Sequence, residues 1–163
     1  MLINIVNINE DGSIGGCAYH RQLAPTTYLT HTTGIPVFNT NAVSTVDFDK
    51  AKVFTMSLSD SNNQSRIIKH HNKPLWVDFD DTWDVETRHP LFDFYKKINY
   101  QEHSKRLCQS ADIVTCTTEH LAEKISKFNK NVIILPNFIS PVDEQFMYSH
   151  TGYKGGLVCP DGS

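Results

Sequence analysis

Short apolar runs that alternate with segments of helical pattern constrain the fold of this 163-residue chain more than any other feature. A near-continuous apolar run rich in β-forming residues is typical of a strand that is covered on both faces. We therefore expect six strands, at residues 1–8, 35–38, 51–56, 74–79, 112–116 and 132–135. The intervening segments predict helices at 17–32, with Pro25 interrupting or kinking it, at 60–72, at 90–110 and from Thr117 or Thr118 to about residue 130.

This alternation predicts an α/β fold, a Rossmann-like three-layer domain with a mainly parallel sheet of about six strands and right-handed crossovers. We assign residues 1–148 to this domain. Residues 149–163 are rich in glycine and show neither a helical nor a strand period, so we interpret them as a linker or tail.

Composition excludes several classes of function. The net charge of −3 and the lack of any Lys/Arg-rich run argue against a non-specific nucleic-acid binder. No transmembrane segment is expected, because no stretch reaches the roughly 20 apolar residues that cross a bilayer. Residues 1–8 lack the basic start and cleavage site of a signal peptide, and the four cysteines are widely spaced without a CxxC pair. We therefore expect a cytoplasmic domain with free thiols and no zinc site.

Three acids, Asp78, Asp80 and Asp81, follow the fourth predicted strand directly. Ligands of open α/β sheets bind at the carboxyl ends of the strands, so this is the first candidate site. The acids could simply cap the next segment, or they could hold Mg²⁺, which prefers carboxylate oxygens.

A glycine-bearing loop with Gly12, Gly15 and Gly16 lies between the first predicted strand and the first predicted helix. Glycines there let the backbone approach a phosphate or a sugar. The pattern is not the G-x-G-x-x-G dinucleotide fingerprint, and a simple tight turn explains it equally well.

The D-x-D-x-T string at residues 78–82 resembles the motif of haloacid-dehalogenase-like phosphatases. That resemblance implies Asp78 as nucleophile and Asp80 as general acid. The family carries this motif on its first strand, however, and follows it with a later acidic pair that holds magnesium. Here three predicted strands precede the motif and no such pair follows it.

A longer resemblance covers roughly residues 3–140. Residues 110–124 (SADIVTCTTEHLAEK) and 131–139 (NVIILPNFI) resemble the glycosyltransferases of the family 4 / family 1-like group. That group often carries the pattern "aDlVtvsTe.La" followed by "v.viPN.id". Three further segments match the group in the right order: GGCAYHR at 15–21 with Pro25, WVDFDD at 76–81, and His89-Pro90 with Tyr95.

The resemblance implies the GT-B architecture, in which two Rossmann-like domains face each other across a cleft. The N-terminal domain mostly holds the acceptor, and the C-terminal domain holds the nucleotide-sugar with a basic pair and an E-x7-E motif. Residues 1–148 correspond to the N-terminal domain, and the donor-binding domain is absent from this sequence. Ser140 also departs from the pattern, because an acid usually stands there.

The same resemblance implies roles for individual residues. Gly15 and Gly16 would lie near the donor diphosphate, followed by Tyr19 and by Arg21, which would neutralise a phosphate or bind an anionic acceptor. Arg21 could equally be a solvated helix charge. The catalytic candidates, one of which would orient the acceptor hydroxyl, are Asp78, Asp80 and Asp81. Further substrate-binding candidates at the same sheet edge are Thr118, Glu119 and Asn137.

The expected reaction is transfer of a sugar from a nucleotide-sugar donor to the hydroxyl of a glycan or other acceptor, once a separate donor-binding domain is supplied. We expect no metal, and no cofactor beyond the nucleotide-sugar co-substrate. Two alternatives remain: a non-catalytic domain that binds a glycan or a partner, and a phosphohydrolase that uses residues 78–82.

Overall fold

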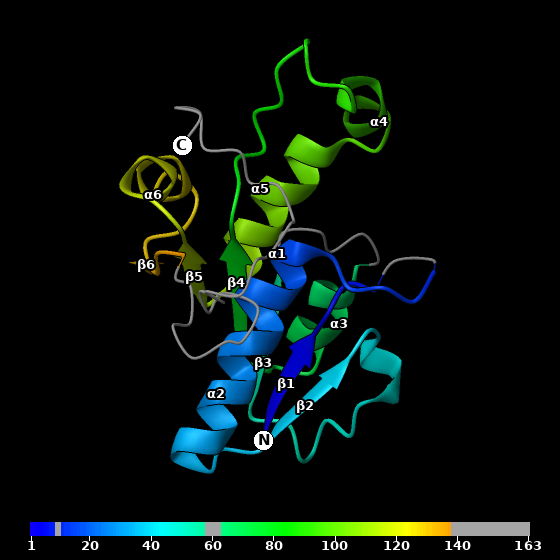
Figure 1. Ribbon diagram of the computed structural model, residues 1–163, viewed down its shortest axis with the longest axis vertical. Helices are drawn as coiled ribbons and strands as arrows, with labels where there is room; N and C mark the ends of the chain where they lie inside the picture. Colours follow the sequence, from blue (N-terminus) through cyan, green and yellow to red (C-terminus); the bar gives the residue numbers. More distant parts are fainter. Residues whose placement is uncertain (9–10, 58–62, 138–163) are drawn as a thin grey trace, which may run out of the picture.

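The computed structural model describes residues 1–8, 11–57 and 63–137, and within them it shows one six-stranded parallel sheet flanked by helices (Figure 1). The order in the sheet is β2-β1-β3-β4-β5-β6. All six predicted strands are confirmed, as is the α/β fold class. Their bounds are β1 Leu2–Ile5, β2 Val37–Thr40, β3 Val53–Ser57, β4 Leu75–Phe79, β5 Ile113–Cys116 and β6 Val132–Ile134. The predicted linker at 149–163 and Ser140 lie outside the described residues.

The first predicted helix is a continuous helical run that contains a π-helical segment. It consists of α1 (Gly16–Ala18), the π-helix η1 (Tyr19–Leu23) and α2 (Ala24–Thr33). Pro25 does not interrupt this run, because it lies in the first turn of α2, directly after η1. In an ordinary α-turn the proline ring would meet the carbonyl four residues earlier, and the wider π turn relieves that clash.

The long helix predicted at 90–110 is instead two helices, α4 (Phe92–Lys97) and α5 (Tyr100–Ser110). The break falls at Asn99, whose φ of 55° is left-handed, a conformation that asparagine tolerates better than most residues. The remaining helical elements are the 3₁₀ turn η2 (Val43–Thr45), α3 (Gln64–His70) and α6 (Glu119–Ile125). No helix in the described part of the chain is both long and apolar enough to cross a membrane.

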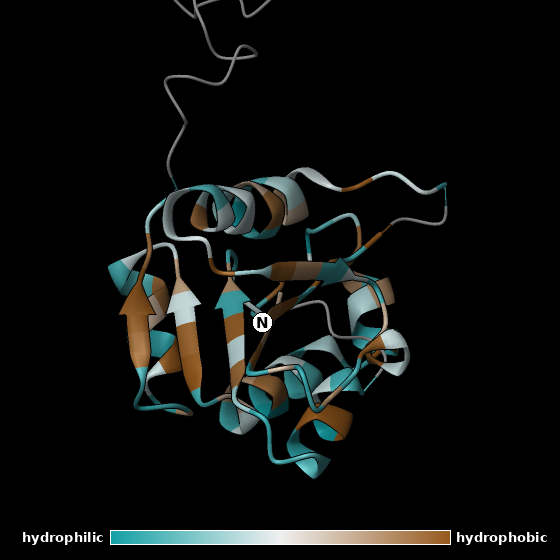
Figure 2. Cartoon of the chain, turned by 90° about the horizontal axis from the view of Figure 1, so that it is seen from below, coloured by the Kyte–Doolittle hydropathy of each residue, from teal (hydrophilic) through white to brown (hydrophobic). Residues whose placement is uncertain are grey.

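The two faces of the sheet differ in chemistry. The run α1-η1-α2 lies on one side and the other helices lie on the opposite side (Figure 2). The side of α3, α5 and α6 holds the apolar core, in which Phe54, Val77 and Phe79 are fully buried. The side of α1-η1-α2 carries a row of buried polar residues that the strand register places on neighbouring strands: Asn4, Thr55, Asp78 and Thr115.

Truncation of Phe54 tests the position of the core. We expect Phe54→Ala to lower the free energy of unfolding by about 3–5 kcal/mol, because the change leaves a cavity that the close-packed core fills poorly. Phe94→Ala is the matched control, since Phe94 is 54% exposed, and we expect it to change the free energy by no more than about 0.5 kcal/mol. Urea unfolding followed by circular dichroism measures both. Equal losses in the two variants would contradict this assignment of the core.

Candidate functional site

The carboxyl ends of β1 and β3 form the edge where the chain changes direction across the sheet. The connection that leaves β1 runs to β2 and the connection that leaves its neighbour β3 runs to β4, so the two leave this edge in opposite directions. Such a point opens a crevice in parallel α/β sheets. Asn7 follows β1 and Ser57 is the last residue of β3; Asn7 Nδ2 donates a hydrogen bond of 2.8 Å to Ser57 Oγ.

The glycine-bearing loop borders open space at this edge. Only Gly12, with a φ of 82°, has a backbone conformation that requires glycine in the loop. A Cβ atom added at Gly15 or Gly16 would meet no atom within 4 Å. These two glycines therefore serve neither the turn nor tight packing, and their lack of side chains leaves the start of α1 open to a ligand.

Arg21 and Asp78 form a buried, bidentate ion pair between η1 and β4. Arg21 Nη2 lies 2.6 Å from Asp78 Oδ1 and Arg21 Nε lies 2.9 Å from Asp78 Oδ2. The side chains are only 6% and 4% exposed. Thr115 Oγ1 also donates to Asp78 Oδ1, and Trp76 Nε1 donates to Thr115 Oγ1 at 2.8 Å. Both carboxylate oxygens of Asp78 are thus engaged within the domain, which suits positioning better than attack on a substrate.

The remaining nitrogen of Arg21 reaches the chain that follows β6. Arg21 Nη1 donates to the carbonyl oxygen of Leu135 at 2.7 Å and to Asn137 Oδ1 at 3.2 Å. Arg21, Asp78 and Asn137, three of the residues singled out in the sequence, therefore come together. Trp76 and Thr115 were not predicted from the sequence to belong to this site. The two-residue period of β4 could have indicated Trp76, because it places Trp76 and Asp78 on the same face of the sheet.

Asp80 and Asp81 lie beyond the end of β4, closer to solvent than Asp78. The side chain of Asp80 lies near the thiol of Cys17, which follows Gly16 directly. Interaction with the Asp80 carboxylate, together with burial and the charge of Asp81, raises the pKa of Cys17 to about 11. The main-chain carbonyl of Asp80 accepts a hydrogen bond of 3.3 Å from Thr117 Oγ1. Asp80 thus connects the glycine-bearing loop with the segment between β5 and α6.

Three further candidate residues lie near this edge of the sheet: Thr118, Glu119 and Tyr19. The side chain of Thr118 is the N-cap of α6 and accepts a hydrogen bond from the amide of Leu121 at 3.2 Å. Glu119 lies in the first turn of α6 and is exposed. Tyr19 is 38% exposed and its ring meets that of His20 edge to face. Of these three, only Thr118 has its side chain engaged in a cap.

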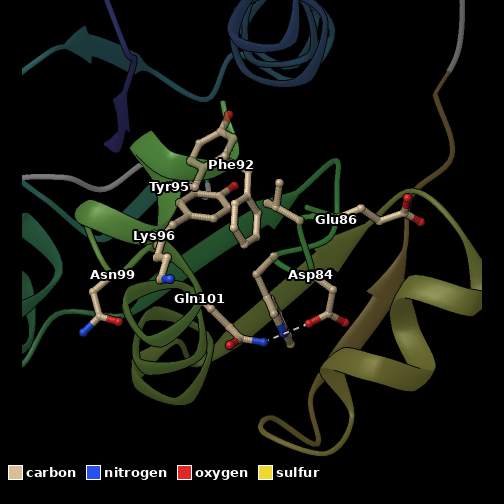
Figure 3. A pocket seen from close by; sticks show the side chains of 10 residues that line it. Asp84, Glu86, Phe92, Tyr95, Lys96, Asn99 and Gln101 are labelled. Atoms are coloured by element: carbon tan, nitrogen blue, oxygen red, sulfur yellow. Dashed lines mark hydrogen bonds between the residues drawn. The ribbon is translucent and has the colours of Figure 1, made fainter. Parts of the chain in front are cut away.

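A pocket lies between the segment after β4 and the helices α4 and α5 (Figure 3). It consists of two adjoining hollows of about 430 and 400 Å³ that share Asp84, Val85, Glu86, Tyr95 and Tyr100. We call it the aromatic pocket; its first hollow is also lined by Trp83, Phe92, Lys96, Asn99 and Gln101, and its second by Asp81, Thr82, Arg88 and His89. Asp81 therefore joins the acidic strand end to this pocket.

The charge state of the aromatic pocket follows from its neighbours. Burial, with the nearby Tyr95, Asp80 and Asp81 adding to it, raises the pKa of Tyr100, so its hydroxyl stays neutral. Burial also favours a higher pKa for Asp84, but hydrogen bonds from Lys124 and Gln101 outweigh it and lower the pKa. Figure 3 shows the bond from Gln101. The pocket thus combines the neutral hydroxyl of Tyr100 with the ionised carboxylate of Asp84, and Lys96 and Arg88 also line it. Of its aromatic residues, only Tyr95 was noted in the sequence.

In the described ranges, no group of three or more His, Cys, Asp or Glu side chains comes together in a way that could hold a metal ion. Cys17, Cys108 and Cys116, the cysteines of the described ranges, are free thiols. No protein-family model matches the sequence, and no curated protein matches it significantly.

Breaking the Arg21–Asp78 pair tests how much the folded structure depends on it. We expect Arg21→Gln and Asp78→Asn each to lower the free energy of unfolding by about 3–5 kcal/mol, because each leaves a buried group without its partner. Replacement of both by apolar residues, in R21M/D78L, should cost less than the sum of the single changes. Lys50→Gln, which breaks the exposed pair with Asp47, should leave the free energy of unfolding nearly unchanged. If the loss of unfolding free energy in the double variant equals the sum of the two single losses, Arg21 and Asp78 are not energetically coupled.

The reactivity of Cys17 tests the contact between the glycine-bearing loop and Asp80. Asp80→Asn removes the negative acceptor, so the pKa of Cys17 should fall from about 11 toward its ordinary value. More thiolate is then present at any given pH below that value, and alkylation of Cys17 by iodoacetamide, followed by mass spectrometry of its peptide, should be several times faster. Asp81→Asn removes only a more distant charge and should have a smaller effect. An unchanged rate in Asp80→Asn would show that the two groups do not meet.

Proposed function

We propose that this chain is the acceptor-side domain of a GT-B glycosyltransferase. In combination with a donor-binding domain, it would transfer a sugar from a nucleotide-sugar to an acceptor hydroxyl. One observation carries the proposal: the aromatic pocket and the open backbone at Gly15 and Gly16 share the carboxyl edge of one parallel sheet. A transferase needs an acceptor site and a donor phosphate site at the same edge.

The aromatic pocket supplies the chemistry that an acceptor sugar needs. Rings such as Tyr95 and Phe92 offer apolar faces against which a sugar ring can pack, and the neutral hydroxyl of Tyr100 can donate or accept a hydrogen bond. Asp84 and Gln101 add polar groups in fixed positions, since they are hydrogen-bonded to each other at 3.0 Å. A mostly apolar pocket with a few fixed polar groups is the common form of a small-ligand site.

The glycine-bearing loop is the proposed contact for the donor diphosphate. Backbone amides can approach phosphate oxygens closely where no side chain intervenes, as at Gly15 and Gly16. Arg21 was a candidate for this contact, but its guanidinium is 6% exposed and bound to Asp78, Leu135 and Asn137. We therefore assign Arg21 and Asp78 to positioning, which holds the helical run and the end of β6 around the donor side.

Asp81 is the residue that we propose acts on the acceptor. It is exposed and lines the second hollow of the aromatic pocket, while Asp80 lies beside Cys17 next to the glycine-bearing loop. An acceptor sugar in the pocket would present a hydroxyl to Asp81 on its way to the donor. Holding that hydroxyl in line, and accepting its hydrogen bond, lowers the barrier to transfer.

The alternatives make different use of the same residues. A non-catalytic glycan-binding domain would use the aromatic pocket without turnover. A phosphohydrolase would need Asp78 as a nucleophile, and the engagement of both Asp78 oxygens by Arg21 and Thr115 disfavours that role. We therefore retain the transferase as the proposed function.

Nucleotide release measures the proposed activity. The chain is combined with a donor-binding domain of this architecture and incubated with nucleotide-sugars and a panel of glycan acceptors. We expect acceptor-dependent release, reduced roughly 10²-fold in Asp81→Asn because the group that orients the hydroxyl is lost. Asp93→Asn, an exposed acid of α4 that does not line the pocket, is the control and should retain full activity.

Other outcomes separate the alternatives. Glycan binding without nucleotide release for any donor would favour the non-catalytic domain. Hydrolysis of p-nitrophenyl phosphate that is lost in Asp78→Asn would instead favour the phosphohydrolase and contradict the transferase.

A further inference from the structure

A second concave surface lies between α3 and α5, on the side of the sheet opposite the run α1-η1-α2. It consists of two hollows of about 340 and 380 Å³ that share Asn63 and Arg66. We call it the α3–α5 groove; it is lined by Asn63, Ser65, Arg66, Ile67, His70, His103, Arg106, Leu107 and Ser110. None of these residues lines the aromatic pocket or belongs to the glycine-bearing loop.

The charge of the α3–α5 groove has one sign. The described residues that line it include two arginines and two histidines but no carboxylate. Among the described residues, neither Arg66 nor Arg106 forms an ion pair. The chain as a whole carries a net charge of −3, so this concentration of positive charge is local. Both arginines are exposed and available to a ligand.

The groove has the donors that a phosphate group requires. A guanidinium presents N–H groups in a planar fork that matches two oxygens of a phosphate, and Arg66 and Arg106 enter the groove from different helices. His103 adds a ring N–H from the turn of α5 before Arg106. Because the groove is hollow, it suits a small ligand group that can enter it better than it suits a flat charged surface. Leu107, 4% exposed, gives the floor an apolar contact.

We propose that the α3–α5 groove binds a phosphate-bearing small molecule, through Arg66, Arg106 and His103. The proposal rests on the groove alone and holds whether or not the chain transfers sugars. The bound group would sit over the helices that cover the apolar core, apart from the aromatic pocket and the open glycines.

Titration of the whole ¹⁵N-labelled chain with inorganic phosphate, at constant ionic strength, tests the proposal. We expect saturable shifts of the backbone amides at 63–70 and 103–110, and little change at residues 80–101. Arg66→Gln and Arg106→Gln should each weaken phosphate binding roughly tenfold, since each removes a charge-assisted contact. Arg106→Lys should be intermediate, because it keeps the charge but loses the fork.

Lys130→Gln is the matched control, because it removes one positive charge from an exposed position outside the groove. It should leave the affinity unchanged. Equal weakening in Lys130→Gln, or shifts that never saturate, would reduce the effect to general charge attraction and overturn the proposal. Sedimentation with phosphatidylglycerol–phosphatidylcholine vesicles is the last arm. Arginine-dependent binding to these vesicles without saturable binding of free phosphate would also overturn it, in favour of a membrane surface.

Discussion

A buried ion pair between Arg21 and Asp78 joins parts of the chain that lie far apart in sequence. It links the π-helix η1 to β4 and, through the third guanidinium nitrogen, to the chain after β6. The pair is sheltered under a helical run on the polar face of the sheet, and Thr115 and Trp76 complete its hydrogen bonding. A buried pair adds little stability over apolar residues but costs much when broken, so its main effect is to fix one arrangement of these elements.

This pair divides the acidic strand end into two parts with different tasks. Asp78 is buried and engaged, so it holds the scaffold, whereas Asp80 and Asp81 lie beyond the strand end. There they stand between the open glycine-bearing loop and the aromatic pocket. In the proposed transferase, the donor and the acceptor approach from these two sides. The Arg21–Asp78 ion pair holds the donor side and the acceptor side in a fixed arrangement, and it does not itself contact a substrate.

The sequence predicted the six strands, the parallel sheet and the carboxyl edge, because the apolar period of a strand and the β–α alternation are local patterns. Three details of the structure could not be predicted from the sequence. The partner of Asp78 depends on which helix crosses β4, a long-range arrangement. The break at Asn99 depends on a single left-handed residue in an otherwise helical pattern. The aromatic pocket gathers residues from 81 to 101 that form a site only after α4 and α5 have turned apart.

A map of glycan binding on the isolated ¹⁵N-labelled chain tests whether this sheet edge is a sugar-binding site. We expect at least one glycan of a varied panel to shift the amides of residues 80–101 saturably. Tyr95→Ala should abolish those shifts, while Tyr28→Ala, which removes a 70% exposed ring on α2, should leave them unchanged. Glycan shifts that survive Tyr95→Ala, or that fall on the far face of the sheet, would show that the aromatic pocket is not a sugar-binding site.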